Sequence, residues 1–282
     1  MSAMDAMDTP LASTTAVQVL AAREDLDQQR QDLLATEEPL EIRALGADAQ
    51  PVSIAVTMRT PGHDLELAAG FLWAEGLLQS PDDLRDPPTT ALHSLGPGNL
   101  LTLRLRRPFD ADVLRRNFVA TSSCGVCGKA TLDQLERAAP PLPTGPVVPR
   151  RVLLGLPAAL RQAQAVFTKT GGLHATGLFD SDGQLLVPRE DVGRHNAFDK
   201  VVGRRVLDRA VPLHGLIGLV SGRLSFELVQ KAAMAGLTLL CAVSAPSSLA
   251  VQTAERVGMT LCGFLRAGGF NVYTHPQRVD LR

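Results

Sequence analysis

The hydrophobic pattern of the first part of the chain predicts a small mixed unit. Apolar β-forming residues recur at short spacing over residues 41–44 and 52–58, and they alternate with polar residues over 99–106, which predicts three strands. Between these strands, residues 65–78 keep apolar side chains at helical spacing, which predicts a helix with one buried face. The N-terminal part is therefore expected to be α+β.

The pattern changes in the C-terminal half. Continuous apolar runs at 216–220, 237–243 and 259–265 alternate with helical segments at 226–235 and 248–257. Continuous runs of this kind, joined by helices, are typical of parallel strands that are covered on both faces. The C-terminal half is therefore predicted to be α/β.

Turn and linker residues divide the chain into four segments. A Pro-rich stretch at 140–146 stops a predicted helix at 129–138 and acts as a linker or a long surface loop. We expect a disordered tail and lead-in, an N-terminal α+β subdomain, a segment with a cysteine loop, helix and linker, and a C-terminal α/β domain. Their bounds are 1–37, 38–118, 119–150 and 151–282.

Composition excludes several classes of protein. A formal net charge of −1 argues against a nucleic-acid-binding protein. No apolar run approaches the roughly 18 residues that span a bilayer, and the first 15 residues lack the basic and apolar regions of a signal peptide. Four cysteines are too few for a disulfide scaffold in a chain of 282 residues. We therefore expect a soluble, cytoplasmic protein with reduced thiols.

The cysteine pair Cys124-Gly125-Val126-Cys127 is the first candidate site. A closed zinc site needs four ligands, and Cys241 and Cys262 stand far apart within predicted buried strands, so the pair is not expected to bind zinc. Small flanking residues favour an accessible loop, and Lys129 with the following helix start favours a thiolate. A reactive thiolate suits the transfer of an atom between partners, whereas two inert cysteines in a turn remain the alternative.

Three loops of the C-terminal half have the composition of anion sites. Ser221 and Arg223 follow the first predicted parallel strand, and Ser244 follows the second. Backbone N–H groups, hydroxyls and guanidinium groups at the start of a helix can converge on a phosphate. Arg266 and a glycine pair follow the last strand and allow the same close approach. Helix capping by serine explains either of the first two loops equally well.

The segment 190–200 is rich in functional residue types. If it is helical, Asp191, His195 and Asp199 lie four residues apart on one face. Such a face can hold a metal, an acid–base pair or a buried polar network. A metal-dependent hydrolase or deaminase that uses these three residues is therefore one alternative function.

Taken together, these segments closely resemble the FdhD family, the sulfurtransferases required for formate dehydrogenase. The resemblance runs over residues 38–278. The motifs that carry it are TPGHDLELAAGFLWAEGLL, SSCGVCGK, TGGLHATGLF, EDVGRHNAFDK, SGRLSFELVQKA, SAPSSLAVQTA and GFLRAGGFNVYTHPQR.

The resemblance implies a persulfide relay. A cysteine desulfurase would give its sulfur to the cysteine pair, with Cys124 as the persulfide carrier and Cys127 as its assistant or resolving thiol. The sulfur would pass to the molybdenum or tungsten of a bis-pterin guanine dinucleotide cofactor, which then activates formate dehydrogenase. A chaperone that binds the cofactor without using its thiols is a second alternative. The protein would have no catalytic metal of its own.

The resemblance also implies a fold, an assembly and a cofactor site. The fold is similar to cytidine deaminases, an αβα sandwich in the C-terminal part, although the deaminase zinc signature is missing from this chain. A homodimer is implied. Ser221, Arg223 and Ser244 follow from the loop pattern, whereas the family implies a further set of cofactor-binding residues. These are Gly263, Phe264, Leu265, Arg266, Ala267 and Gly268.

Overall fold

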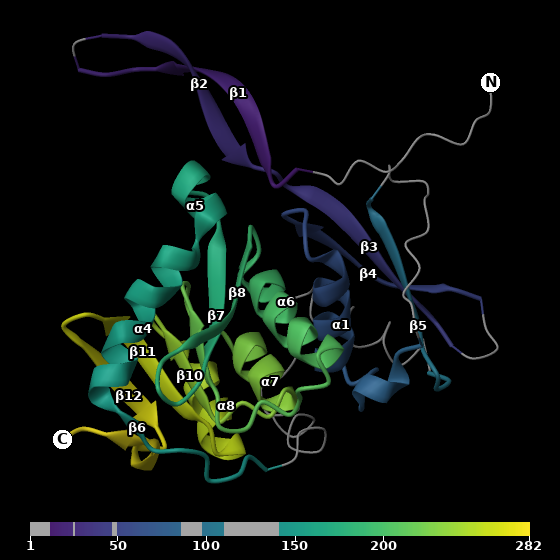
Figure 1. Cartoon of the computed structure of the whole chain (residues 1–282), viewed down its shortest axis with the longest axis vertical. Helices are drawn as coiled ribbons and strands as arrows, with labels where there is room; N and C mark the ends of the chain where they lie inside the picture. The colour runs from purple at the N-terminus through teal and green to yellow at the C-terminus, as the bar shows by residue number, and fades with distance from the viewer. Residues whose placement is uncertain (1–11, 25, 47–49, 86–97, 110–140) are drawn as a thin grey trace.

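The computed structural model describes residues 12–24, 26–46, 50–85, 98–109 and 141–282. A six-stranded sheet forms the centre of a mixed α/β structure, and a three-stranded sheet with its own helix lies beside it (Figure 1). A two-stranded hairpin projects from this body (Figure 1).

The six-stranded sheet has the order β12-β11-β10-β9-β7-β8. Its strands are β7 (His174–Phe179), β8 (Leu185–Asp191), β9 (Ile217–Val220), β10 (Leu239–Ala242), β11 (Thr260–Arg266) and β12 (Gly269–Thr274). Strands β9, β10 and β11 are parallel neighbours, as the three continuous apolar runs predict, and the outer strands join antiparallel. The carboxyl ends of the three parallel strands therefore lie at one edge of the sheet.

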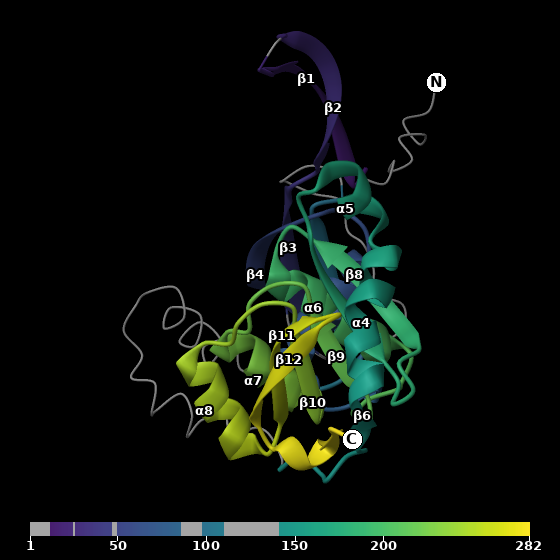
Figure 2. The same ribbon diagram turned by 90° about the vertical axis from the view of Figure 1, so that its left-hand side faces the viewer.

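Helices cover both faces of this sheet. Helix α4 (Arg150–Ala163) packs on one face, where its buried leucines meet Phe179 and Leu219. The other face is covered by α6 (Arg194–Leu207), α7 (Phe226–Met234) and α8 (Ser248–Val257). Figure 2 shows α4 on one side of the strands and α7 and α8 on the other. The C-terminal part is thus a three-layer αβα arrangement.

The N-terminal unit contains β3 (Glu38–Leu45), β4 (Val52–Arg59), β5 (Leu100–Arg104), α1 (Asp64–Ala74) and the short η1 (Pro81–Asp83). Helix α1 ends before the predicted boundary because Gly76 has a φ of 74° and its N–H bonds back to the Trp73 carbonyl. Helices α1 and α6 lie so close that a Cβ at Gly203 would be 1.7 Å from the Glu66 carbonyl oxygen. This contact joins the two units.

The expected tail and lead-in contains regular structure. Strands β1 (Thr14–Ala21) and β2 (Gln28–Ala35) form an antiparallel hairpin along their full length. The hairpin escapes prediction because the second strand begins with Gln-Gln-Arg-Gln and most of its side chains are exposed, so no apolar alternation marks it.

The remaining elements are short. They are α5 (Ala165–Thr170), β6 (Val148–Pro149), η2 (Pro276–Arg278) and β13 (Val279–Asp280). The helix predicted at 129–138 lies outside the described residues. Among the described segments, none of the helices combines the length and apolar character needed to cross a bilayer.

Candidate functional site

The predicted catalytic cysteines, Cys124 and Cys127, lie outside the described residues. The other two thiols, Cys241 and Cys262, face each other on β10 and β11 and are fully buried. A hydrogen bond with Cys262, together with burial, raises the pKa of the Cys241 thiol well above its usual range. These two cysteines are therefore a packed, unreactive pair within the core.

The three predicted anion loops meet at the carboxyl edge of the sheet. The loop after β9 is bonded to the loop after β10, because the Leu224 N–H donates to the Ala245 carbonyl at 3.1 Å and the Ser247 N–H donates to the Leu224 carbonyl at 2.9 Å. The loop after β10 is bonded in turn to β11, since the Phe264 N–H donates to the Ser244 carbonyl at 3.1 Å. The structure thus brings Ser221, Arg223, Ser244 and the segment 263–268 into one continuous edge.

The residues of the segment 263–268 differ in exposure and backbone conformation. A Cβ at Gly263 would lie 2.9 Å from Pro246 and 3.2 Å from the Ser244 carbonyl oxygen, so this approach requires glycine. Phe264 has a φ of 54° and is 40% exposed, whereas Leu265 is buried in the core. Arg266, Ala267 and Gly268 are exposed where β11 turns into β12. Leu265 can therefore reach a ligand through its backbone alone.

Ser221 forms two hydrogen bonds with Ala175 of β7 at this edge. Its hydroxyl accepts the Ala175 N–H at 2.9 Å, and its own N–H donates to the Ala175 carbonyl at 2.9 Å. Both bonds fix the loop against β7, and the hydroxyl hydrogen of Ser221 remains available as a donor.

Unpaired arginines give this edge its charge. Within the described chain, no carboxylate lies within ion-pair distance of the exposed guanidinium groups of Arg223 and Arg266. Arg194, at the start of α6, has a buried Nε without a partner, and its Cδ lies 3.8 Å from the position of a Cβ on Gly222. Sequence reasoning missed Arg194. Three cations to which the described residues offer no carboxylate partner can bind phosphate groups.

His195 lies beside the same loop. Its Nε2 is 3.2 Å from the Ser225 hydroxyl oxygen and 3.9 Å from a Glu227 carboxylate oxygen. Burial, with the nearby charges of Arg194 and Lys231, lowers the pKa of His195 to about 4. The imidazole is therefore neutral at pH 7 and shares a hydrogen bond with the Ser225 hydroxyl.

Asp191, His195 and Asp199 do not share a helical face, which corrects the prediction for the segment 190–200. Asp191 is the last residue of β8, and α6 begins at Arg194 after Gly193. The Asp199 carboxylate, one turn after His195 on α6, accepts from Lys231 at 2.8 Å. In the described segments no three His, Cys, Asp or Glu residues gather closely enough to hold a metal ion. The geometry therefore gives no support to the hydrolase alternative.

Asp191 instead anchors a buried ion pair. The Lys200 ammonium lies 2.7 Å from an Asp191 oxygen and donates to the Thr60 carbonyl at 2.8 Å and the Glu190 carbonyl at 3.3 Å. Asp191 also accepts from Gly193. Both charged residues are almost fully buried. The sequence pattern predicts a functional role for Asp191, but it does not predict the pairing with Lys200.

The fold and this edge define a mixed α/β protein with a cationic loop cluster at the carboxyl edge of its central sheet. Residues 35–280 match the model of the FdhD/NarQ family, and the chain belongs to that family. Curated relatives named sulfur carrier protein FdhD include one from Nocardia farcinica, 50% identical over 89% of each chain. Another, from Sulfurisphaera tokodaii, is 44% identical over 93% of this chain and 98% of its own.

A solved structure shows a similar fold. It is the crystal structure of a protein from Desulfotalea psychrophila described as a formate dehydrogenase accessory protein. Its TM-score with this chain is 0.73 at 25% sequence identity, over 95% of this chain and 99% of that one.

Proposed function

We propose that this chain is a cytoplasmic sulfurtransferase that serves formate dehydrogenase. It takes persulfide sulfur from a cysteine desulfurase and delivers it to the metal of a molybdenum or tungsten bis-pterin guanine dinucleotide cofactor. The observation that carries the proposal is membership in the FdhD/NarQ family, with relatives named as sulfur carriers along nine-tenths of the chain.

The first step of the sulfur transfer needs no external oxidant or reductant. The Cys124 thiolate attacks the terminal sulfur of the desulfurase persulfide, a new S–S bond forms on Cys124, and the desulfurase leaves as its thiolate. Cys127 assists or resolves the persulfide when the sulfur moves on.

The cofactor is the acceptor substrate of this reaction. Its guanine dinucleotide arms carry pyrophosphates, and the carboxyl-edge loops supply groups that suit them. Arg223 and Arg266 are exposed without carboxylate partners in the described chain, and Arg223 comes two residues before Ser225, the N-cap of α7. Ser244 and Gly263 would allow the cofactor to approach the backbone. This arrangement supports acceptor binding at the edge.

We also infer that the protein acts as a homodimer and that its αβα part is similar to cytidine deaminases. The projecting β1–β2 hairpin supports a dimer, because β2 contacts α5 and the hairpin still exposes Leu20, Leu26 and Leu34. The order of helix, sheet and helix layers agrees with the inferred fold similarity. Sedimentation of the full chain would show a mass twice that of the monomer.

Mass spectrometry of the loaded protein tests the sulfur transfer. Incubation with a cysteine desulfurase and cysteine should add about 32 Da, one sulfur atom, to the wild-type chain. Cys124→Ala should abolish the adduct, whereas Cys241→Ala should retain it, because Cys241 is buried and its thiol is protonated. An adduct of equal yield on Cys124→Ala would refute the assignment of the carrier thiol.

A further inference from the structure

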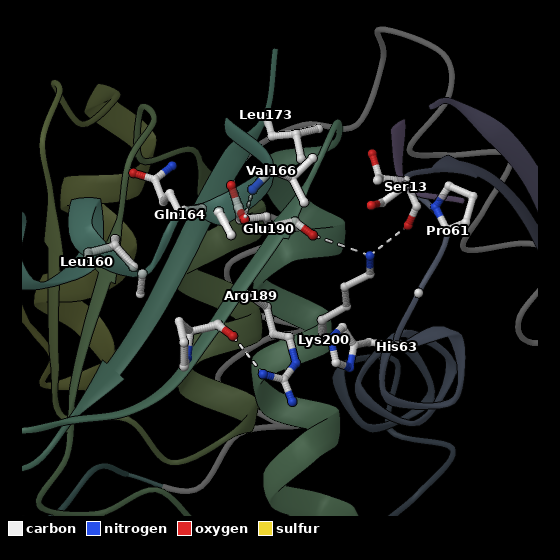
Figure 3. A pocket seen from close by; sticks show the side chains of 16 residues that line it. Ser13, Pro61, His63, Leu160, Gln164, Val166, Leu173, Arg189, Glu190 and Lys200 are labelled. Carbon is white, nitrogen blue, oxygen red and sulfur yellow. Dashed lines mark hydrogen bonds between the residues drawn. The ribbon is translucent and has the colours of Figure 1, made fainter. Parts of the chain in front are cut away.

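A cavity of about 350 Å³ lies between the turn that enters α1 and the start of α5 (Figure 3). Two charged residues that line it are satisfied by the protein itself. Lys200 pairs with Asp191 and donates to two backbone carbonyls. The Glu190 carboxylate accepts two backbone N–H groups at 3.0 and 2.8 Å. The Lys200 and Glu190 charges therefore stabilise the fold.

A smaller pocket, of about 70 Å³, lies at the C-terminal end of α6. Its lining comes from both units of the fold. Three of its apolar residues are partly buried and pack on the core, namely Leu65, Leu84 and Leu207. Three of its residues are arginines, namely Arg85, Arg104 and Arg209. The pocket thus combines an apolar floor with guanidinium groups.

Two of these arginines face each other. The Arg85 N–H donates to the Arg104 carbonyl at 2.9 Å, beside the antiparallel bridge between Leu84 and Leu105. Both side chains are exposed and line the same pocket. Like charges at opposed positions of a strand pair repel each other, so this arrangement does not serve the fold. An anion between the two guanidinium groups would remove the repulsion.

The described residues do not supply enough anions. Asp82 pairs with Arg209. In the part of the chain that the structure describes, no carboxylate lies within ion-pair distance of Arg85 or Arg104. One described carboxylate therefore serves three guanidinium groups, and the pocket keeps an excess of positive charge for a partner.

The third arginine has a backbone conformation that favours glycine. Arg209 follows α6 with a φ of 57°, and its N–H donates to the Val206 carbonyl at 3.0 Å. Helices commonly end with glycine in this left-handed conformation, because glycine adopts it without strain. Arginine at this position is therefore less favourable for the fold than glycine, but it places a third guanidinium group at the pocket.

The size and chemistry of the pocket fit part of a peptide. Pockets for small molecules have volumes of roughly 300–1,000 Å³, which is several times larger. The apolar floor suits one aliphatic side chain. Carboxylates on either side of that side chain would pair with the guanidinium groups, whose planar fork matches a carboxylate.

We propose that this pocket docks an acidic peptide segment of a partner protein, with one aliphatic side chain of the segment on the apolar floor. The site goes beyond the proposed function, because it uses neither the cysteine pair nor the carboxyl-edge loops. At 1.5 Å per residue, Val206 lies roughly 18 Å along α6 from Arg194 at that edge. A docked segment would therefore leave the loops free.

Fluorescence anisotropy with a labelled peptide, Glu-Asp-Leu-Asp-Glu, tests the proposal. The full-length protein should bind the peptide in 0.1 M salt. Binding should be at least tenfold weaker in 1 M salt, because the screening length falls from about 10 to about 3 Å. Alanine in place of the leucine should weaken binding about fivefold, since less apolar surface is buried. The neutral peptide Gln-Asn-Leu-Asn-Gln should not bind.

Variants then locate the bound peptide. Arg85→Gln and Arg104→Gln should each weaken binding about fivefold. Arg209→Gly should also weaken it, whereas its unfolding free energy in urea should equal or exceed that of wild type, because glycine suits the helix end. Arg151→Gln, at an exposed position on α4, is the matched control and should bind the peptide as the wild type does.

Four results would overturn the proposal. Wild-type protein that does not bind the acidic peptide at millimolar concentration has no such site. Equal binding by wild type, Arg85→Gln and Arg104→Gln would place the peptide elsewhere. Displacement of the peptide by guanosine diphosphate would place it at the carboxyl edge. Tighter binding of a ten-residue thymidine oligonucleotide, lost in Arg85→Gln, would make the pocket part of a nucleic-acid site.

Discussion

Two charged regions of the molecule differ in how their charges are satisfied. Where α1 and β4 meet α6, Lys200 pairs with Asp191, and the buried Arg59 donates to Asp64 and to the Gly98 carbonyl. At the carboxyl edge of the sheet, the described groups offer no carboxylate partner to Arg223 or Arg266.

The difference separates structural charge from charge that can bind a ligand. The loss of one member of a buried ion pair leaves its partner buried without a counter-charge, which destabilises the folded chain. An exposed arginine without a partner contributes little to stability, but it keeps its full capacity for a phosphate. The number of charged residues in a motif does not separate structural charge from ligand-binding charge, because both regions contain motifs of the same family.

The largest effect should come from breaking the buried pair. Lys200→Met leaves the Asp191 carboxylate buried without its cation, so the free energy of unfolding should fall by about 3–5 kcal/mol. Urea denaturation measures the change. Lys169→Met, at an exposed position on α5, is the control and should change stability by about 0.5 kcal/mol or less. A loss below about 1 kcal/mol for Lys200→Met would show that the ion pair contributes little to the stability of the fold.

The contact between α1 and α6 should be the next most sensitive feature. Gly203→Ala forces a Cβ against the Glu66 carbonyl oxygen, so we expect a loss of about 1–3 kcal/mol in the same denaturation assay.

Gly155 of α4 provides the matched control for that substitution. A Cβ at Gly155 meets no atom within 4 Å, so Gly155→Ala should stabilise the protein by up to about 1 kcal/mol through helix propensity. Equal effects at the two glycines would mean that the helices are not in close contact.

The unpaired arginines should affect ligand binding and leave stability almost unchanged. Arg223→Gln and Arg266→Gln should each weaken the binding of guanosine diphosphate about tenfold in calorimetry, because a charge-assisted bond is lost. Their unfolding free energies should stay within about 0.5 kcal/mol of wild type. A stable variant that binds the diphosphate with wild-type affinity would exclude its arginine from the site.

The smallest effect should be a pH dependence at His195. Its pKa is lowered to about 4 in the folded chain against a usual value of 6.5, so the folded state resists protonation. The stability that depends on neutral His195 is present above pH 6.5 and is lost as the pH falls toward 4. Because the side chain is 34% exposed, solvent screening limits the change to about 1 kcal/mol.

Denaturation of His195→Gln between pH 7 and pH 4 measures this contribution. The variant should lose less stability than wild type over that window. His214→Gln, at an exposed position, serves as the control. An acid profile for His195→Gln that is identical to wild type would show that His195 does not contribute.

The sequence predicts the core elements well for a physical reason. The parallel strands appear as continuous apolar runs because both faces are covered, and α8 matches the predicted range 248–257 because Ser247 caps it and Gly258 ends it. The carboxyl-edge site follows from this topology, since parallel strands bring their loops to one edge.

The remaining features depend on contacts between distant segments. Lys200 finds its partners in β8 and at Thr60, the residue after β4, and Arg194 is recognisable as unpaired among the described residues only after its neighbours are placed. The helical-face prediction for Asp191 fails because β8 continues through this residue. The roles of Cys124 and Cys127 stay predictions, since both lie outside the described residues.

Restoration of formate dehydrogenase activity tests the central claim most directly. A cell that lacks its own sulfur carrier should recover the activity when it expresses the wild-type chain or Cys262→Ala, a change at a buried thiol. Cys124→Ala, expressed at the same level and still able to bind guanosine diphosphate, should restore none. Full activity with Cys124→Ala would contradict sulfur transfer through this thiol and would favour a chaperone that only binds the cofactor.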